Sequence, residues 1–234
     1  DASVIFKLDT SGNINNNRIY NITSNNFSKI YNVSQNDDYY YFSGRYKGTV
    51  TLKSEELTST SSSEDIFILK TDSNLDDIWI RKTYGDNDDY PGAMTKDQHG
   101  NIYMTGFFNS NNFTTDSTES IKSEVIHNRN HRDIFIFKYN KNGTLQWANS
   151  YGTSSEDWSR QIIHQQNIIY ITGHYGDDIQ FGDQTLNHVG GEDFFVGTFD
   201  TDGKKLRAFG LNQQGSADES GIVLSIAPDN SFYT

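Results

Sequence analysis

Three carboxylates recur at similar places in the chain, each directly before another acidic or an aromatic residue. They are Asp89 before Tyr90, Asp157 before Trp158, and Asp218 before Glu219. Carboxylate oxygens are ligands for hard cations such as calcium, and aromatic rings offer an apolar face on which a sugar can stack. An aspartate can also fix a turn by accepting hydrogen bonds from backbone amides, and a residue repeated in a repeat protein usually serves the repeat itself. We therefore favour turn formation for the aspartates, and keep Asp89, Tyr90, Asp157, Trp158 and Asp218 as a candidate binding site at the mouth of a central channel.

A second acidic motif, Asp200-Thr-Asp202-Gly203, resembles half of a calcium loop. Oxygen ligands at alternate positions followed by a glycine turn suit a hard cation. The other copies of this turn carry serine or asparagine at the place of Asp202, and the glutamate that completes an EF-hand is missing. A hairpin turn is therefore favoured, with Asp200 and Asp202 as a weak calcium candidate, and no other cofactor is expected.

Catalytic motifs are scarce. His127 and His131 have the spacing of a helical zinc motif, but the accompanying glutamate is missing and the surrounding residues are typical of a loop. The arginines occupy unlike positions in the repeats, so we do not expect them to converge on one ligand. The sequence contains no P-loop, dinucleotide fingerprint or G-x-S-x-G element. These observations predict a protein that is not an enzyme.

The composition excludes several classes of protein. Lys and Arg number 19 against 31 Asp and Glu, which gives a net charge of −12 and argues against binding to nucleic acid. The sequence has no cysteine, which removes disulfides, thiolate nucleophiles and cysteine-ligated metals. No apolar run is long enough to span a bilayer as a helix, so we do not expect a membrane-spanning protein.

The elements that must position these residues form an internal repeat. An aspartate followed by an apolar run begins near residues 1, 65, 133 and 193. A second anchor, Tyr-x-Thr-Gly or a close variant, occurs as Tyr41 to Gly44, Tyr103 to Gly106 and Tyr170 to Gly173. The last copy reads Phe232-Tyr233-Thr234, which aligns Phe232 with the tyrosine of the anchor. A repeat of this kind should be identified before any element is assigned.

Each repeat is predicted to hold four strands, which in the third copy cover roughly residues 157–164, 168–175, 193–200 and 205–210. The second and third strands are apolar on both faces, whereas the fourth alternates and carries Trp79 or Trp147, as an outer strand would. Small antiparallel sheets covered on both faces are typical of radially stacked sheets. We predict an all-β fold, a β-propeller of four-stranded antiparallel blades with about four blade-equivalents. Sixteen strands allow either a closed four-blade ring or part of a larger propeller.

The repeat resembles the bacterial β-propeller repeat called SBBP. The resemblance rests on Asp-x-Phe-Val-x-Lys-x-Asp-x-x-Gly-x-x-x-Trp followed by Gly-Asn-x-Tyr-x-Thr-Gly, best matched from Asp65 to Gly106 and from Asp133 to Gly173. It covers nearly the whole chain, although Asn16 and Arg207 replace the tryptophan in the outer copies. The resemblance implies a blade of a secreted or surface protein and no single activity.

Three connections, residues 48–64, 109–132 and 176–192, are rich in polar residues and join the second and third strands. Variable loops on a rigid scaffold often carry binding functions, and their polarity suits a hydrated partner. We predict an extracellular or cell-surface scaffold, adhesion and binding module for protein or polysaccharide, expected to be part of a larger chain or assembly. The alternative is a glycan-active hydrolase, which would need two carboxylates about 5 to 10 Å apart in a central pocket.

Overall fold

The computed structural model describes residues 2–21, 27–35, 38–52, 55–59, 63–116, 131–211, 224–227 and 231–233. Within these ranges all regular elements are β-strands, and every strand pairing is antiparallel. The all-β prediction is confirmed. A helix long and apolar enough to cross a membrane does not occur among the described residues.

Three antiparallel sheets contain four consecutive strands of the repeat each. The first sheet consists of β3 (Phe27–Gln35), β4 (Tyr39–Lys47), β7 (Glu64–Asp72) and β8 (Asp77–Tyr84), with β11 (Thr114–Thr115) added beside β8. The second consists of β9 (Asp89–Lys96), β10 (Ile102–Phe108), β12 (Asp133–Tyr139) and β13 (Leu145–Tyr151). The third consists of β14 (Trp158–Gln165), β15 (Ile168–Tyr175), β18 (Asp193–Asp200) and β19 (Lys205–Leu211). In each sheet we call the first of these strands the inner strand and the fourth the outer strand.

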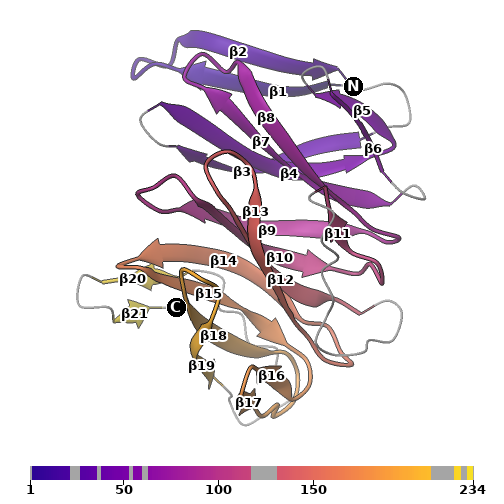
Figure 1. Ribbon diagram of the computed structural model, residues 1–234, viewed down its shortest axis with the longest axis vertical. Coiled ribbons are helices and arrows are strands. Elements are labelled where there is room, and N and C mark those ends of the chain that lie inside the picture. Colours follow the sequence, from indigo (N-terminus) through magenta and orange to yellow (C-terminus); the bar gives the residue numbers. More distant parts are fainter. Residues whose placement is uncertain are drawn as a thin grey trace.

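The two ends of the chain form separate two-stranded sheets. They are β1 (Ala2–Leu8) with β2 (Ile14–Asn21), and β20 (Ser225–Ile226) with β21 (Phe232–Tyr233). Figure 1 shows the three larger sheets stacked along the long axis, with β1 and β2 at one end and β20 and β21 beside the third sheet. A closed four-blade ring, in which these two pairs share a sheet, is therefore not the arrangement of this structure.

The polar connections contain strands that the sequence did not reveal. These are β5 (Thr49–Leu52) with β6 (Glu55–Thr58), β16 (Ile179–Phe181) with β17 (Gln184–Leu186), and the short β11. Val50, Leu57, Ile179, Phe181 and Leu186 are buried. A few apolar side chains thus fold the connections into hairpins against the core, so the prediction of sixteen strands was too low.

The last copy of the repeat is displaced by one residue from the sequence alignment. Its turn is closed by a hydrogen bond from Ala227 N to Ser231 O, as the turn between β9 and β10 is closed from Asp97 N to Asn101 O. Counting from these equal turns places Tyr233, and not Phe232, at the position of Tyr103. The turn length sets the register, which residue types alone did not show.

The glycine of the Tyr-x-Thr-Gly anchor lies opposite an irregularity in the inner strand. The register of β3, β9 and β14 shifts beside Gly44, Gly106 and Gly173. A Cβ atom at these glycines would lie 2.2, 2.2 and 1.9 Å from backbone carbonyl oxygens of the inner strand. The close approach of two backbones therefore requires glycine here.

Each tryptophan of the outer strands holds the turn that follows the third strand of the next sheet. Trp79 on β8 donates from Nε1 to Lys141 O at 3.2 Å, and Trp147 on β13 donates to Thr201 O at 3.1 Å. Lys70 and Lys138, on the neighbouring third strands, donate to the same two carbonyl oxygens at 3.0 and 2.7 Å. The predicted placement of both tryptophans at matched outer-strand positions is confirmed.

Candidate functional site

Asp89 and Asp157 begin the inner-strand region of the second and third sheets, and both are fully buried. Asp89 accepts hydrogen bonds from Asn109 N at 3.0 Å and Ser110 Oγ at 2.8 Å. Asp157 accepts from Thr153 Oγ1 at 2.7 Å and Gly176 N at 3.1 Å. In this structure these oxygens accept hydrogen bonds from the loops after β10, β13 and β15, which is the turn-forming role that the sequence offered beside ligand binding.

Burial also shifts the acidity of these groups. Desolvation raises the pKa of Asp89 well above its usual value, and the nearby Asp65 carboxylate raises it further. Desolvation likewise raises the pKa of Asp157 to about 7, with a smaller contribution in the same direction from Asp133. Burial therefore penalises the charged form of both carboxyl groups in the folded chain.

We expect the stability of the protein to fall as the pH rises from about 4 to about 7. Folded Asp157 keeps its proton up to a pKa of about 7, whereas the unfolded value is 3.8, so in this window the folded state binds more protons. This group alone lowers the free energy of unfolding by up to about 1.4 kcal/mol per pH unit.

Urea unfolding at a series of pH values tests this expectation. Asp157→Asn should flatten the pH dependence, whereas Asp202→Asn, which removes an exposed turn carboxylate, should leave it unchanged. The comparison uses the slope of the free energy of unfolding against pH, so it does not depend on how the asparagine alters stability at any one pH. Equal slopes in the wild type and Asp157→Asn would contradict the assignment.

The remaining candidates from the sequence either form a hairpin turn or lie outside the residues that the structure describes. Asp200 Oδ1 accepts backbone hydrogen bonds from Asp202 N at 3.0 Å and Lys204 N at 2.9 Å, which is the geometry of a hairpin turn. Among the described residues, no group of three His, Cys, Asp or Glu side chains is arranged to hold a metal ion. Asp218 and His127 lie outside the described residues.

Tyr90 and Trp158 belong to a row of arginines and aromatic rings that crosses the inner strands. We call this row the cation–aromatic column; its members are Arg45, Tyr90, Phe107, Arg132, Trp158 and Arg160. The Arg45 guanidinium lies 3.8 Å from the centre of the Tyr90 ring, which stacks on Phe107 at 4.7 Å. Arg132 lies 4.9 Å from the Phe107 ring and 5.2 Å from the Trp158 ring. The Arg160 guanidinium lies 4.2 Å from the centre of the Trp158 ring.

Acidic side chains hold two of the three arginines in place. Arg45 forms an ion pair with Glu64, and Arg132 forms one with Glu156 at 3.0 Å. Arg45 is buried, Arg132 is half-buried and Arg160 is exposed. The column therefore holds its guanidinium groups and rings in fixed positions, and Arg160 is its exposed positive charge on a protein whose net charge is −12.

The sequence showed only part of this column. It singled out Tyr90 and Trp158 but treated the arginines as scattered, whereas Arg132 and Arg160 both contact Trp158. The residue after the anchor glycine offered a signal, because Arg45 follows Gly44 and Phe107 follows Gly106. A residue at that position lies directly opposite the inner strand. In the second sheet this residue is Phe107, and it pairs with Tyr90.

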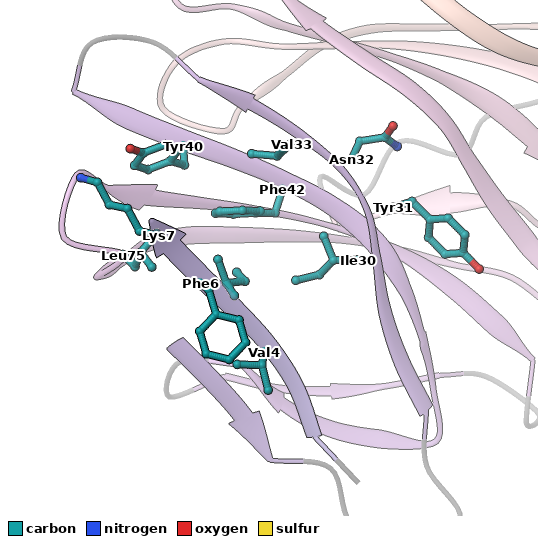
Figure 2. A pocket seen from close by; sticks show the side chains of 11 residues that line it. Val4, Phe6, Lys7, Ile30, Tyr31, Asn32, Val33, Tyr40, Phe42 and Leu75 are labelled. Carbon is teal, nitrogen blue, oxygen red and sulfur yellow. The ribbon is translucent and has the colours of Figure 1, made fainter. Parts of the chain in front are cut away.

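A separate cavity of about 400 Å³ lies beside β1. Val4 and Phe6 of β1 line it from one side, and Tyr40 and Phe42 of β4 also contribute to its lining (Figure 2). Its lining is mainly apolar and contains no carboxylate. It is therefore unlike the acidic pocket that glycoside hydrolysis requires.

Comparison with known proteins reveals a distant similarity to a viral protein. No protein-family model matches the chain. An uncharacterized WD repeat-containing protein, L264, of Acanthamoeba polyphaga mimivirus is 28% identical over 125 residues. The similarity covers 50% of this chain but only 9% of the viral protein, so the chain corresponds to a small part of that relative.

Proposed function

We propose that the three stacked sheets are blades of a β-propeller, as the resemblance to SBBP repeats implies. The four-stranded antiparallel order and the repeated contacts between neighbouring sheets support this architecture. The WD repeats named in the similar viral protein are consistent with a repeat fold. Because the stack is open, further blades would be needed to close the ring.

The function that we propose is a non-catalytic binding module for a protein partner that presents acidic side chains. The cation–aromatic column carries this proposal, since it concentrates guanidinium groups at one end of the inner strands of an otherwise acidic protein. Arg160, the exposed member, can reach a carboxylate on the partner, and complementary charge gives such an interface its specificity. The part of Trp158 that stays exposed between Arg132 and Arg160 supplies apolar contact area beside it.

A protein partner suits the column better than a polysaccharide. A guanidinium at 3.8 Å and a nearly parallel ring at 4.7 Å cannot share one face of Tyr90, so Arg45 and Phe107 cover both faces. Arg160 and Arg132 lie against Trp158. Little flat ring surface is left on which a sugar could stack, although the guanidinium groups remain suited to carboxylates.

A hydrolase is the weaker candidate. Asp89 and Asp157, the carboxylates that the sequence singled out, are buried and engaged by loop donors. The cavity beside β1 contains no acidic side chain that could act as a general acid or nucleophile. An extracellular or cell-surface location and a role in adhesion stay predictions drawn from the resemblance.

Selection from a displayed random-peptide library tests the binding function. We expect the purified protein to enrich peptides rich in Asp and Glu, and Arg160→Glu to weaken the binding of those peptides by about tenfold or more. Arg207→Glu is the matched control, because Arg207 is also exposed but lies on the outer strand β19, and this variant should bind normally. Enrichment of no acidic peptide, equal loss in both variants, or binding to a polysaccharide array in place of peptides would contradict the proposal.

A further inference from the structure

The three larger sheets repeat a pair of side chains at the end where the cation–aromatic column lies. One member follows the anchor glycine, and the other precedes the aspartate of the third strand. The pairs are Arg45 with Glu64, Phe107 with Arg132, and His174 with Glu192. The first pair contains a permanent cation and the second is a cation–aromatic contact, whereas the third contains a histidine. Histidine is the side chain whose charge changes between about pH 8 and pH 5.

His174 is buried on β15 and touches a ring of the column. Its imidazole makes a T-shaped contact with Trp158, with the ring centres 5.6 Å apart. Arg132 and Arg160 lie against the same indole ring. Because His174 is buried, water and salt screen its charge less than they screen a surface charge. A proton on His174 therefore changes the potential where Arg160 meets a ligand.

Three carboxyl groups face His174 from the described elements packed against it. Glu192 Oε2 lies 3.8 Å from the imidazole Nδ1, within the distance of an ion pair. Asp157 and Asp193 stand at the start of the two strands that flank His174, and each accepts a hydrogen bond from a loop amide, at 3.1 and 2.7 Å. Burial raises the pKa of Asp157 to about 7, so this group titrates in the same range as a histidine. An experiment must separate the two.

The net charge of the third pair depends on pH, whereas that of the first does not. Arginine keeps its proton throughout, so the Arg45–Glu64 pair is neutral. A neutral His174 leaves its pair with Glu192 negative, and a proton on the imidazole makes this pair neutral as well. Aspartate and glutamate side chains of a partner stay ionised down to about pH 5. Mild acidification therefore removes a negative charge from the binding surface without discharging the partner.

We propose that protonation of His174 strengthens the binding of an acidic partner at the cation–aromatic column. The inference rests on the proposed function and adds the regulation of the same site. With a neutral histidine the third pair repels carboxylates, and with a charged histidine it takes the charge of the Arg45–Glu64 pair. The partner is then held more tightly in mildly acidic solution than at neutral pH.

Fluorescence anisotropy with a rhodamine-labelled peptide of alternating glycine and aspartate tests the proposal. At constant ionic strength, the affinity should rise roughly threefold to tenfold from about pH 8 to about pH 5.5. His174→Phe installs the residue of the second sheet and should keep the affinity low at both values. His174→Arg installs the residue of the first sheet and should keep it high at both.

Two control variants separate His174 from the other titrating groups. His188→Gln removes a half-buried histidine from the loop that carries Glu192, and should keep the pH dependence of the wild type. Asp157→Asn should keep most of it. Loss of the pH dependence in Asp157→Asn but not in His174→Phe would overturn the proposal. Binding that does not vary with pH would overturn the switch alone, whereas no binding at any pH would contradict the proposed function and the switch with it.

Nuclear magnetic resonance of the imidazole groups gives a second measurement that needs no peptide. The signal that disappears in His174→Phe belongs to this residue, and in the wild type it should shift between about pH 8 and pH 5.5 as the ring gains its proton. A His174 signal that stays constant over this range would overturn the switch even if the peptide binds.

Discussion

Replacing Gly106 by alanine will lower the free energy of unfolding by about 3 kcal/mol, the upper end of the usual range for an overpacked site. The added Cβ would lie 2.2 Å from the carbonyl oxygen of Tyr90 and 2.8 Å from the amide nitrogen of Gly92. Both are backbone atoms of β9, so no side-chain rotation relieves the overlap, and β9 and β10 must separate. In a chain of this size the melting temperature should fall by roughly 6 to 12 °C.

Gly182→Ala is the matched control for that experiment. Gly182 has a φ of +59°, yet an added Cβ would come no nearer than 3.7 Å to another residue. Gly182→Ala should lower the free energy of unfolding by about 1 kcal/mol, the cost of placing alanine in the left-handed backbone conformation alone. If Gly106→Ala were no worse than Gly182→Ala, the backbone of β9 would be able to move away, and the close approach would not explain the glycine.

Replacing Trp79 by alanine will lower the free energy of unfolding by about 3 to 5 kcal/mol, the range measured for buried large aromatic residues. Trp79 is buried between two sheets, and an added Cβ at Gly143 would lie only 3.0 Å from its ring. The substitution removes this packing together with the hydrogen bond to Lys141 O. Chemical unfolding measured by circular dichroism gives the change directly.

Two further variants test how much of this loss comes from the hydrogen bond and how much depends on burial. Trp79→Phe keeps an aromatic ring but removes the N–H donor, and should lose a smaller amount that includes about 1 kcal/mol for the hydrogen bond. Trp147→Ala should cost less than Trp79→Ala, because Trp147 is only half-buried. A loss below about 1 kcal/mol for Trp79→Ala would mean that the two sheets repack without it.

Most of the fold could be predicted from the sequence because a strand covered on both faces has a distinctive pattern. The runs led by Asp65, Asp133 and Asp193 each form the third strand of a sheet, and the third-copy boundaries differ from those observed by about one residue. The hairpins β5–β6 and β16–β17 were missed because only a few buried side chains stabilise them within polar segments. The register of β20–β21 depends on a turn length, which local residue types did not reveal.

The candidate site was harder to predict, because burial and contact across sheets decide which residues are available. Asp89 and Tyr90 are neighbours in sequence, yet the carboxylate is buried among loop amides while the ring lies in the cation–aromatic column. Arg132 and Trp158 come together only because the second and third sheets stack. A repeat alignment shows equivalent positions, but it does not show which side chains from different copies will meet.

The hydrogen bonds from one sheet to the next end on main-chain oxygens. Trp79 and Lys70 both bind the carbonyl of Lys141, while Trp147 and Lys138 both bind that of Thr201. The receiving residues contribute a peptide group, which every amino acid possesses, so their side chains are free to diverge during evolution. A duplicated copy can therefore join the stack without matching changes at these two receiving positions. Arrays of this repeat can lengthen by gene duplication while the side chains at those positions drift, and the turn glycines stay fixed because a Cβ at Gly143 or Gly203 would lie 3.0 or 2.7 Å from a tryptophan ring.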